Sequence, residues 1–89
     1  MGDVLVIMRI LPNSDEVDID QMIKDIQNVL PSGVVLRQYK KEEFAYGLMA
    51  LVIGFTMPDE EGYANLLEQR IRGVEGVGEI SIERITRIL

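Results

Sequence analysis

The stretch VVLRQYKKEEFAYGLMALVIGFT, residues 34–56, decides the fold, because it places two predicted strands side by side with no helix between them. Residues 34–42 alternate well enough for a strand, and residues 45–56 are rich in Leu, Val, Ile and Phe. Only the short connection at residues 42–44 separates them. This pattern predicts an antiparallel hairpin in the middle of the chain.

One strand and one helix are predicted before the hairpin. Residues 3–11 form a run that is apolar after Asp3 and broken only by Arg9, which favours a central strand buried on both faces. Asp18 followed by Gln21 resembles a capping box, and the helix that it starts ends at Pro31. Apolar residues recur at helical spacing between them: Ile19, Met22, Ile23, Ile26, Val29 and Leu30.

A second helix and a last strand are predicted after the hairpin. The acidic residues 59–61 lie where a helix N-terminus favours negative charge, and an apolar stripe at helical spacing follows them. Residues 79–83 alternate with period two, and residues 84–89 continue with the apolar phase shifted by one. This shift predicts a bulge near Glu83 and Arg84, in a strand that we expect to leave regular pairing late.

The predicted order is βαββαβ, which is typical of the ferredoxin-like fold. We therefore expect an α+β sandwich in which a four-stranded antiparallel sheet carries both helices on one face. The 89 residues and 10.1 kDa fit one domain, residues 1–89, and leave no room for a second one.

The composition excludes several classes of function. The chain has no Cys and no His, which removes a cysteine nucleophile, the commonest general base and the commonest zinc ligands, so we expect no enzyme, no metal and no cofactor. The net charge of −6 repels phosphate backbones and argues against direct binding to nucleic acid. The apolar stretches are too short to span a bilayer. We expect a cytoplasmic protein with no membrane partner, monomeric when free.

Two motifs have weaker functional interpretations. Carboxylates cluster at predicted helix starts, where they cap amide groups, and no EF-hand spacing surrounds them. The FAYG sequence at residues 44–47 lies where RNA-recognition modules of this fold present aromatic rings, but the basic residues that such modules need are missing. Neither motif supports a site. The clusters are Asp15 with Glu16, Asp18 with Asp20, and Asp59 with Glu60 and Glu61.

After these exclusions, the function that remains is binding to another protein. The second strand and its hairpin combine aromatic and basic side chains, which are enriched at interface hot spots. Ordinary sheet packing is the alternative for each aromatic residue. The residues of this surface are Tyr39, Lys40, Lys41, Phe44 and Tyr46.

The sequence FAYGLMAL, residues 44–51, follows a basic strand and precedes an acidic helix start, and the chain here resembles the archaeal translation elongation factor 1-beta family. The VEGV sequence at residues 74–77 and the opening strand that leads into Pro12 and Asp18 extend the resemblance. It implies a guanine-nucleotide exchange factor that binds the GTPase elongation factor 1-alpha and speeds GDP release.

The resemblance also implies site residues. Tyr46, between Ala45 and Gly47, occupies the place of the family's third-strand aromatic residue. In eukaryotic members a Lys next to the C-terminal residue reaches the magnesium site of the GTPase, but Ile88 stands in that place here. Arg87 is the substitute candidate. We therefore expect the GTPase to contact a set that the resemblance and the hairpin surface define together: Lys40, Lys41, Phe44, Tyr46, Arg87, Ile88 and Leu89.

Two alternatives stay open. Ile88 and Leu89 are apolar and could instead close the edge of the core. A regulatory module of the same fold could bind a small effector between subunits, with the glycine-rich residues 73–78 as its ligand loop.

Overall fold

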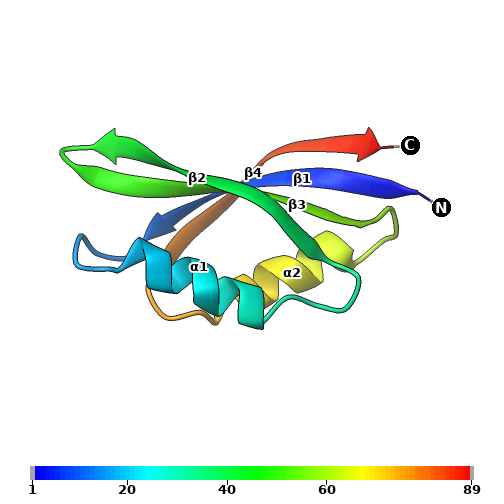
Figure 1. The fold of residues 1–89 in the computed structure, drawn as a ribbon, viewed down its shortest axis with the longest axis horizontal. Helices are drawn as coiled ribbons and strands as arrows, with labels where there is room; N and C mark the ends of the chain where they lie inside the picture. Colours follow the sequence, from blue (N-terminus) through cyan, green and yellow to red (C-terminus); the bar gives the residue numbers. More distant parts are fainter. Residues whose placement is uncertain (1, 89) are drawn as a thin grey trace.

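The computed structural model describes residues 2–88 and contains four strands and two helices in the order βαββαβ (Figure 1). The four strands form one antiparallel sheet in the order β2-β3-β1-β4, and both helices lie on the same face of it. The predicted ferredoxin-like fold is confirmed. The elements are β1 (Asp3–Pro12), α1 (Ile19–Asn28), β2 (Val35–Ala45), β3 (Leu48–Pro58), α2 (Tyr63–Arg72) and β4 (Val77–Ile88).

The core lies between the sheet and the helices. Alternate residues of β1 are buried in it, and strand β3, which pairs with β1, contributes a second row of apolar side chains. Each helix closes this layer with its apolar stripe. Among residues 2–88 no polar or charged side chain is buried. The largest buried side chains include Phe55, Met8, Ile10, Met22, Ile26, Leu67 and Ile71.

Strand β1 is central, as predicted, but it is not buried on both faces. Its side chains alternate between buried ones, such as Val6 and Met8, and partly exposed ones, such as Leu5, Ile7 and Arg9. The prediction was wrong because both helices cover the same face of the sheet. The other face, called the open face below, is in contact with solvent.

The two helices begin in different ways. The carboxylate of Asp18 accepts hydrogen bonds from the backbone N–H groups of Asp20 and Gln21, at 3.1 and 3.3 Å, which confirms it as the N-cap of α1. Helix α2 starts after Gly62, which has φ 97° and turns the chain, so the acidic residues 59–61 stay outside its first turn. Their predicted role at the start of this helix was therefore wrong. Neither helix among residues 2–88 is long and apolar enough to cross a membrane.

Strand β4 contains the predicted bulge. Ile82 lies opposite Met8, and Arg84 lies opposite the preceding residue Ile7, so Glu83 is the extra residue. The pairing then continues to Ile88. The expectation that the strand leaves regular pairing late was wrong, because the one inserted residue accounts for the whole phase shift.

The glycine-rich segment, residues 73–78, packs against the end of β1 at Gly78, the second residue of β4. A Cβ atom on Gly78 would lie 2.9 Å from the carbonyl oxygen of Leu11 and 3.0 Å from that of Pro12. Both contacts are with backbone atoms, so no side-chain rotation could relieve them. Close packing therefore explains this glycine without a bound ligand.

We predict that Gly78→Ala destabilises the fold by about 1–3 kcal/mol, the usual effect of overpacking. Gly73→Ala is the matched control, because its Cβ would meet only Arg70 O at 3.5 Å, an ordinary contact. We expect the control to change stability by less than about 1 kcal/mol. Urea denaturation of the three proteins measures both effects, and equal midpoints for all three would contradict the close approach at Gly78.

Candidate functional site

The tip of the β2–β3 hairpin is a two-residue turn at Tyr46 and Gly47. Both residues have positive φ, 52° and 83°, as a type I′ hairpin turn requires. The connection predicted at residues 42–44 is wrong, because β2 continues to Ala45. Gly47 occupies the second position of the turn and adopts its positive φ without strain, which favours a turn at residues 46–47 over one at residues 42–44.

Tyr46 projects from this tip into solvent. Its relative exposure of 104% shows that its ring packs against no other part of the described chain. A left-handed conformation is uncommon for a bulky residue and indicates local strain. Tyr46 therefore lies in the turn and not in the third strand, and the sheet-packing alternative is wrong for it.

Phe44, two residues before the tip, lies next to a cation from the central strand. The guanidinium carbon of Arg9 is 5.7 Å from the centre of the Phe44 ring, within the range of a cation–π interaction. Phe44 is 50% exposed, so its ring contacts Arg9 but remains partly accessible to solvent.

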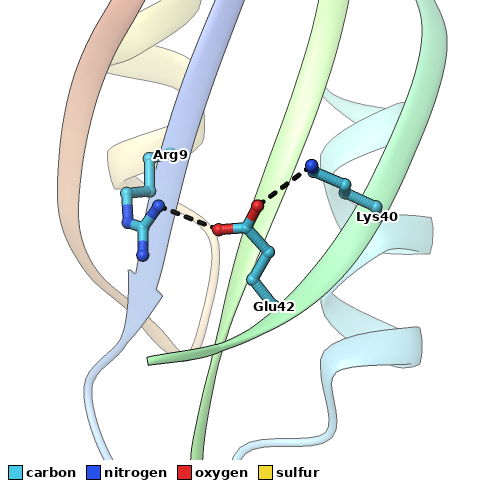
Figure 2. Close-up of polar contacts among 3 residues, drawn as sticks. All are labelled: Arg9, Lys40 and Glu42. Carbon is cyan, nitrogen blue, oxygen red and sulfur yellow. Dashed lines mark hydrogen bonds and ion pairs between the residues drawn. The ribbon is translucent and has the colours of Figure 1, made fainter. Parts of the chain in front are cut away.

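Glu42 connects two cationic side chains, Arg9 and Lys40, across the open face (Figure 2). Its two carboxylate oxygens each lie 3.0 Å from a cation, Oε1 from Arg9 Nη1 and Oε2 from Lys40 Nζ. The hydrogen bond from Lys40, and secondly the one from Arg9, lowers the pKa of Glu42 below its usual value. Because Arg9 lies on β1 and Glu42 on β2, this network crosses β3.

Arg9 and Glu42 were not predicted as site residues. Arg9 could have been singled out as the only charged residue within the apolar residues 4–11. Its partner could not, because the contact with Glu42 depends on how β1 and β2 each pair with β3, which the sequence does not specify. Glu42 and Glu43 lie within β2, not at the hairpin tip.

Lys41 points to a different part of the molecule from Lys40. Its Nζ lies 2.8 Å from Oδ1 of Asp20 on α1, and this hydrogen bond raises the pKa of Lys41. Neighbouring residues of a strand point to opposite faces. The structure therefore places Lys40 with Arg9 on the open face and Lys41 on the face that carries the helices.

Arg87 and Ile88 lie near the C-terminus, opposite the first residues of β1. Arg87 pairs with Val4 and Ile88 with Asp3. The Arg87 side chain is 76% exposed, and its Nε lies 2.9 Å from Oδ2 of Asp59. Ile88 is 38% exposed, so it is only partly packed. Leu89, which was predicted with them, lies outside the described residues.

The predicted site residues thus fall into two groups at opposite ends of the sheet. The hairpin tip extends past the last residues of β1, whereas Arg87 and Ile88 lie beside its first residues. Figure 1 shows the β2–β3 turn and the C-terminus at opposite ends of the longest dimension, which is 42 Å. No single small patch contains both groups.

The structure offers little to a metal ion or a small effector. Within residues 2–88 no group of three or more possible ligands could hold a metal ion. A groove of about 400 Å³ borders the glycine-rich loop at Gly76, but it is open and its charged lining is wholly acidic. The charged residues that line it are Glu16, Asp18, Asp25 and Glu75.

Known proteins similar to this chain are archaeal elongation factors. Elongation factor 1-beta of Ignicoccus hospitalis is 40% identical over 89 residues, which cover 99% of this chain and 95% of the relative. Elongation factor 1-beta of Sulfolobus acidocaldarius is 39% identical over 87 residues, 97% of each chain. The protein of the same name from Methanothermobacter thermautotrophicus is 34% identical over the full length of both.

Residues 5–88 match the family described as the EF-1 guanine nucleotide exchange domain. This match and the names of the relatives support guanine nucleotide exchange in translation elongation as the function, and they do not favour the small-effector alternative. The resemblance found in the sequence is confirmed. The chain belongs to the EF-1 guanine nucleotide exchange domain family.

Proposed function

We propose that the chain accelerates GDP release from the GTPase elongation factor 1-alpha by contacting it with both ends of its sheet. Tyr46 and Phe44 form the contact at the hairpin tip, and Arg87, Ile88 and Leu89 form the contact at the C-terminal end. One copy of the single domain acts in the cytoplasm as a monomer, without a cofactor and without direct contact to nucleic acid. The full exposure of Tyr46 in a strained turn carries this proposal.

The backbone strain at Tyr46 supports a role in contacting another protein. A non-glycine residue in the left-handed region costs on the order of 1–3 kcal/mol and persists where the surroundings enforce it. Asn or Gly would fit the same turn without a large side chain. The ring makes no packing contact that would offset this cost within residues 2–88, so we infer that it packs against the GTPase.

Exchange needs differential binding and no covalent chemistry. A binder shifts a GTPase toward an open, nucleotide-free state only if it binds that state more tightly than the GDP-bound state. A rigid sheet with a contact at each end can bind the open state more tightly, because the GTPase can make both contacts at the same time in only one conformation. Magnesium, which bridges the phosphates in such GTPases, is the point most sensitive to an added cation.

Arg87 is our candidate for that cation. Its guanidinium is permanently charged and can bind carboxylate or phosphate oxygens in a bidentate manner. Asp59 holds it at the rim of the sheet while about three quarters of the side chain stays exposed. We propose that the GTPase replaces Asp59 as its partner.

The two lysines have different parts in the proposal. Lys40 contributes through Glu42, because their ion pair belongs to the network that also places Arg9 beside Phe44. Lys41 is paired with Asp20 of α1 and can reach the GTPase only if that exposed pair opens.

We predict that Tyr46→Asn lowers the rate of GDP release at least tenfold and leaves the free energy of unfolding unchanged or increased. The substitution removes the ring and supplies a residue that type I′ turns favour. Stopped-flow release of fluorescent GDP from elongation factor 1-alpha measures the rate, and thermal melts of the same preparation measure stability. Tyr46→Phe is the control and should keep most of the activity. A fully active Tyr46→Asn protein would rule out the hairpin contact.

We also predict that Arg87→Ala lowers the saturated rate of GDP release while changing stability by less than about 1 kcal/mol, as expected for an exposed ion pair. Asp59→Asn is the matched control, because it breaks the same ion pair but keeps the cation. It should leave the rate unchanged or raise it. Equal losses in both variants would show that the ion pair has only a structural role.

A further inference from the structure

The open face of the sheet has an apolar stripe along its centre, called the central stripe below. Leu5 and Ile7 of β1 and Val52 of β3 form it, and each of these side chains is partly exposed. Val52 lies opposite Arg9, which is on the open face, so all three residues share that face. Both helices lie on the other face (Figure 1), and within residues 2–88 no helix or strand covers the central stripe.

Gly54 opens a hollow in the central stripe. It lies in β3 between Ile7 of β1 and Gln38 of β2, to which it is paired. A Cβ atom on Gly54 would lie 3.2 Å from Cδ1 of Ile7 and 3.2 Å from Cγ of Gln38, so a side chain here would fill this space. The hollow has a volume of about 340 Å³, and Lys40 and Val52 also line it. It has room for an apolar side chain of a partner.

Cations border the central stripe on both sides and at one end. On the β2 side lie Lys40 and Arg37, and Nε of Arg37 donates a hydrogen bond of 2.9 Å to Oγ1 of Thr56 on the open face. On the β4 side lies Arg84, which is paired with a residue of the stripe. Arg9 lies at the end next to the hairpin (Figure 2). Four of the nine cations of the chain are therefore gathered here.

The carboxylates of the open face leave two of these cations without a partner. Glu42 is paired with Arg9 and Lys40, as described above. Asp3 and Glu79 pair with the two ends of β1 and β3, away from the stripe, and Glu83 is the bulge residue at the edge of the sheet. Among the described residues, neither Arg37 nor Arg84 forms an ion pair. The open face thus offers permanent positive charge beside apolar surface, in a chain whose net charge is −6.

We propose that the open face binds an acidic amphipathic helix of another protein, at a site separate from both GTPase contacts. Strands lie about 4.8 Å apart, so the outer strands β2 and β4 are about 14 Å apart, and a helix with its side chains is about 10–12 Å wide. The apolar stripe of such a helix covers the central stripe and inserts a side chain at Gly54. Its flanking carboxylates then reach Arg37 on one side and Arg84 on the other.

The open face fits a helix better than it fits a nucleic acid. Single-stranded nucleic acid binds to grooves in which aromatic rings stack on the bases, and the central stripe is aliphatic. The net charge of −6 also repels a phosphate backbone more strongly than it repels a short peptide with a few carboxylates.

The site is also separate from the proposed contacts with the GTPase. Tyr46 projects from the hairpin tip, and Arg87 pairs with Val4, which is buried on the helix side, and bonds to Asp59. Neither contact includes the central stripe, Arg37 or Arg84. This proposal therefore does not rest on the proposed function, and either can fail without the other.

A designed peptide tests the chemistry of this site. The probe is a fluorescein-labelled helix of about 18 residues, built from Leu, Glu and Ala, with leucines at helical spacing and glutamates on both flanks. We expect a Kd of tens to hundreds of micromolar, as is usual for a small interface, and a gain in peptide helicity on binding. A peptide with Gln in place of Glu, and a scrambled peptide without the apolar stripe, should bind at least tenfold more weakly.

Three results with the wild-type protein would overturn the proposal. The first is no binding of the acidic peptide at about 1 mM protein, measured by fluorescence anisotropy. The second is binding without a gain in helicity, measured by circular dichroism. The third is equally tight binding of a single-stranded DNA oligonucleotide of the same charge, because the face would then attract any polyanion.

Paired charge reversals test the location of the site. Arg37→Glu with Arg84→Glu should weaken peptide binding at least tenfold and leave the GDP-release curve of elongation factor 1-alpha unchanged. Lys24→Glu with Arg72→Glu is the matched control, because it changes the net charge equally but lies on the two helices. The control should bind the peptide within about threefold of the wild type, since distant exposed charges are screened by salt.

Val52→Thr is a second variant that leaves the charges in place. It keeps a β-branched side chain but puts a hydroxyl group in the central stripe, and it should weaken peptide binding at least twofold. Circular dichroism checks that each variant is folded. Equal losses of peptide binding in the two double variants would overturn the proposal. So would a shift in the GDP-release curve confined to the Arg37→Glu and Arg84→Glu protein, since the GTPase would then use this face.

Discussion

The placement of β1 between β3 and β4, with both helices on one face, is the constraint on which the rest of the structure depends. Because β1 is paired on both sides, its backbone hydrogen bonds are satisfied in the centre of the sheet. Its alternate residues Val6 and Met8 then anchor the core, while Arg9 is left on the open face. The two outer strands β2 and β4 become edges, and both groups of predicted site residues lie on or next to these outer strands.

This arrangement fits the proposed exchange mechanism, which needs a rigid binding surface and no covalent chemistry. The apolar layer holds the sheet as one body, and the Arg9–Glu42 interaction ties edge strand β2 to the centre. The hairpin tip and the C-terminal end are thereby kept at a fixed separation along the 42 Å axis. In the proposed mechanism, a GTPase that contacts both ends must adapt to that separation, and this adaptation opens it.

The sequence predicted the fold well and the site less well. The order of elements, the cap at Asp18 and the bulge at Glu83 follow from local patterns, and the structure contains all three. The turn at Tyr46 was missed because a tyrosine at positive φ contradicts the usual preference for Asn or Asp there. The partners of Arg9 and Arg87 were missed because they come from strands or loops distant in sequence.

The most direct test of the central claim is a double-mutant cycle on GDP release. The rate of release from elongation factor 1-alpha would be measured by stopped flow, at saturating exchange factor, for wild type, Tyr46→Asn, Arg87→Ala and the double variant. Because the account requires both contacts on one GTPase at the same time, the loss of either contact should remove most of the acceleration, and we predict that the double variant is little slower than the slower single variant. Fold-losses that multiply would contradict the account, because they would show that the two ends act independently of each other.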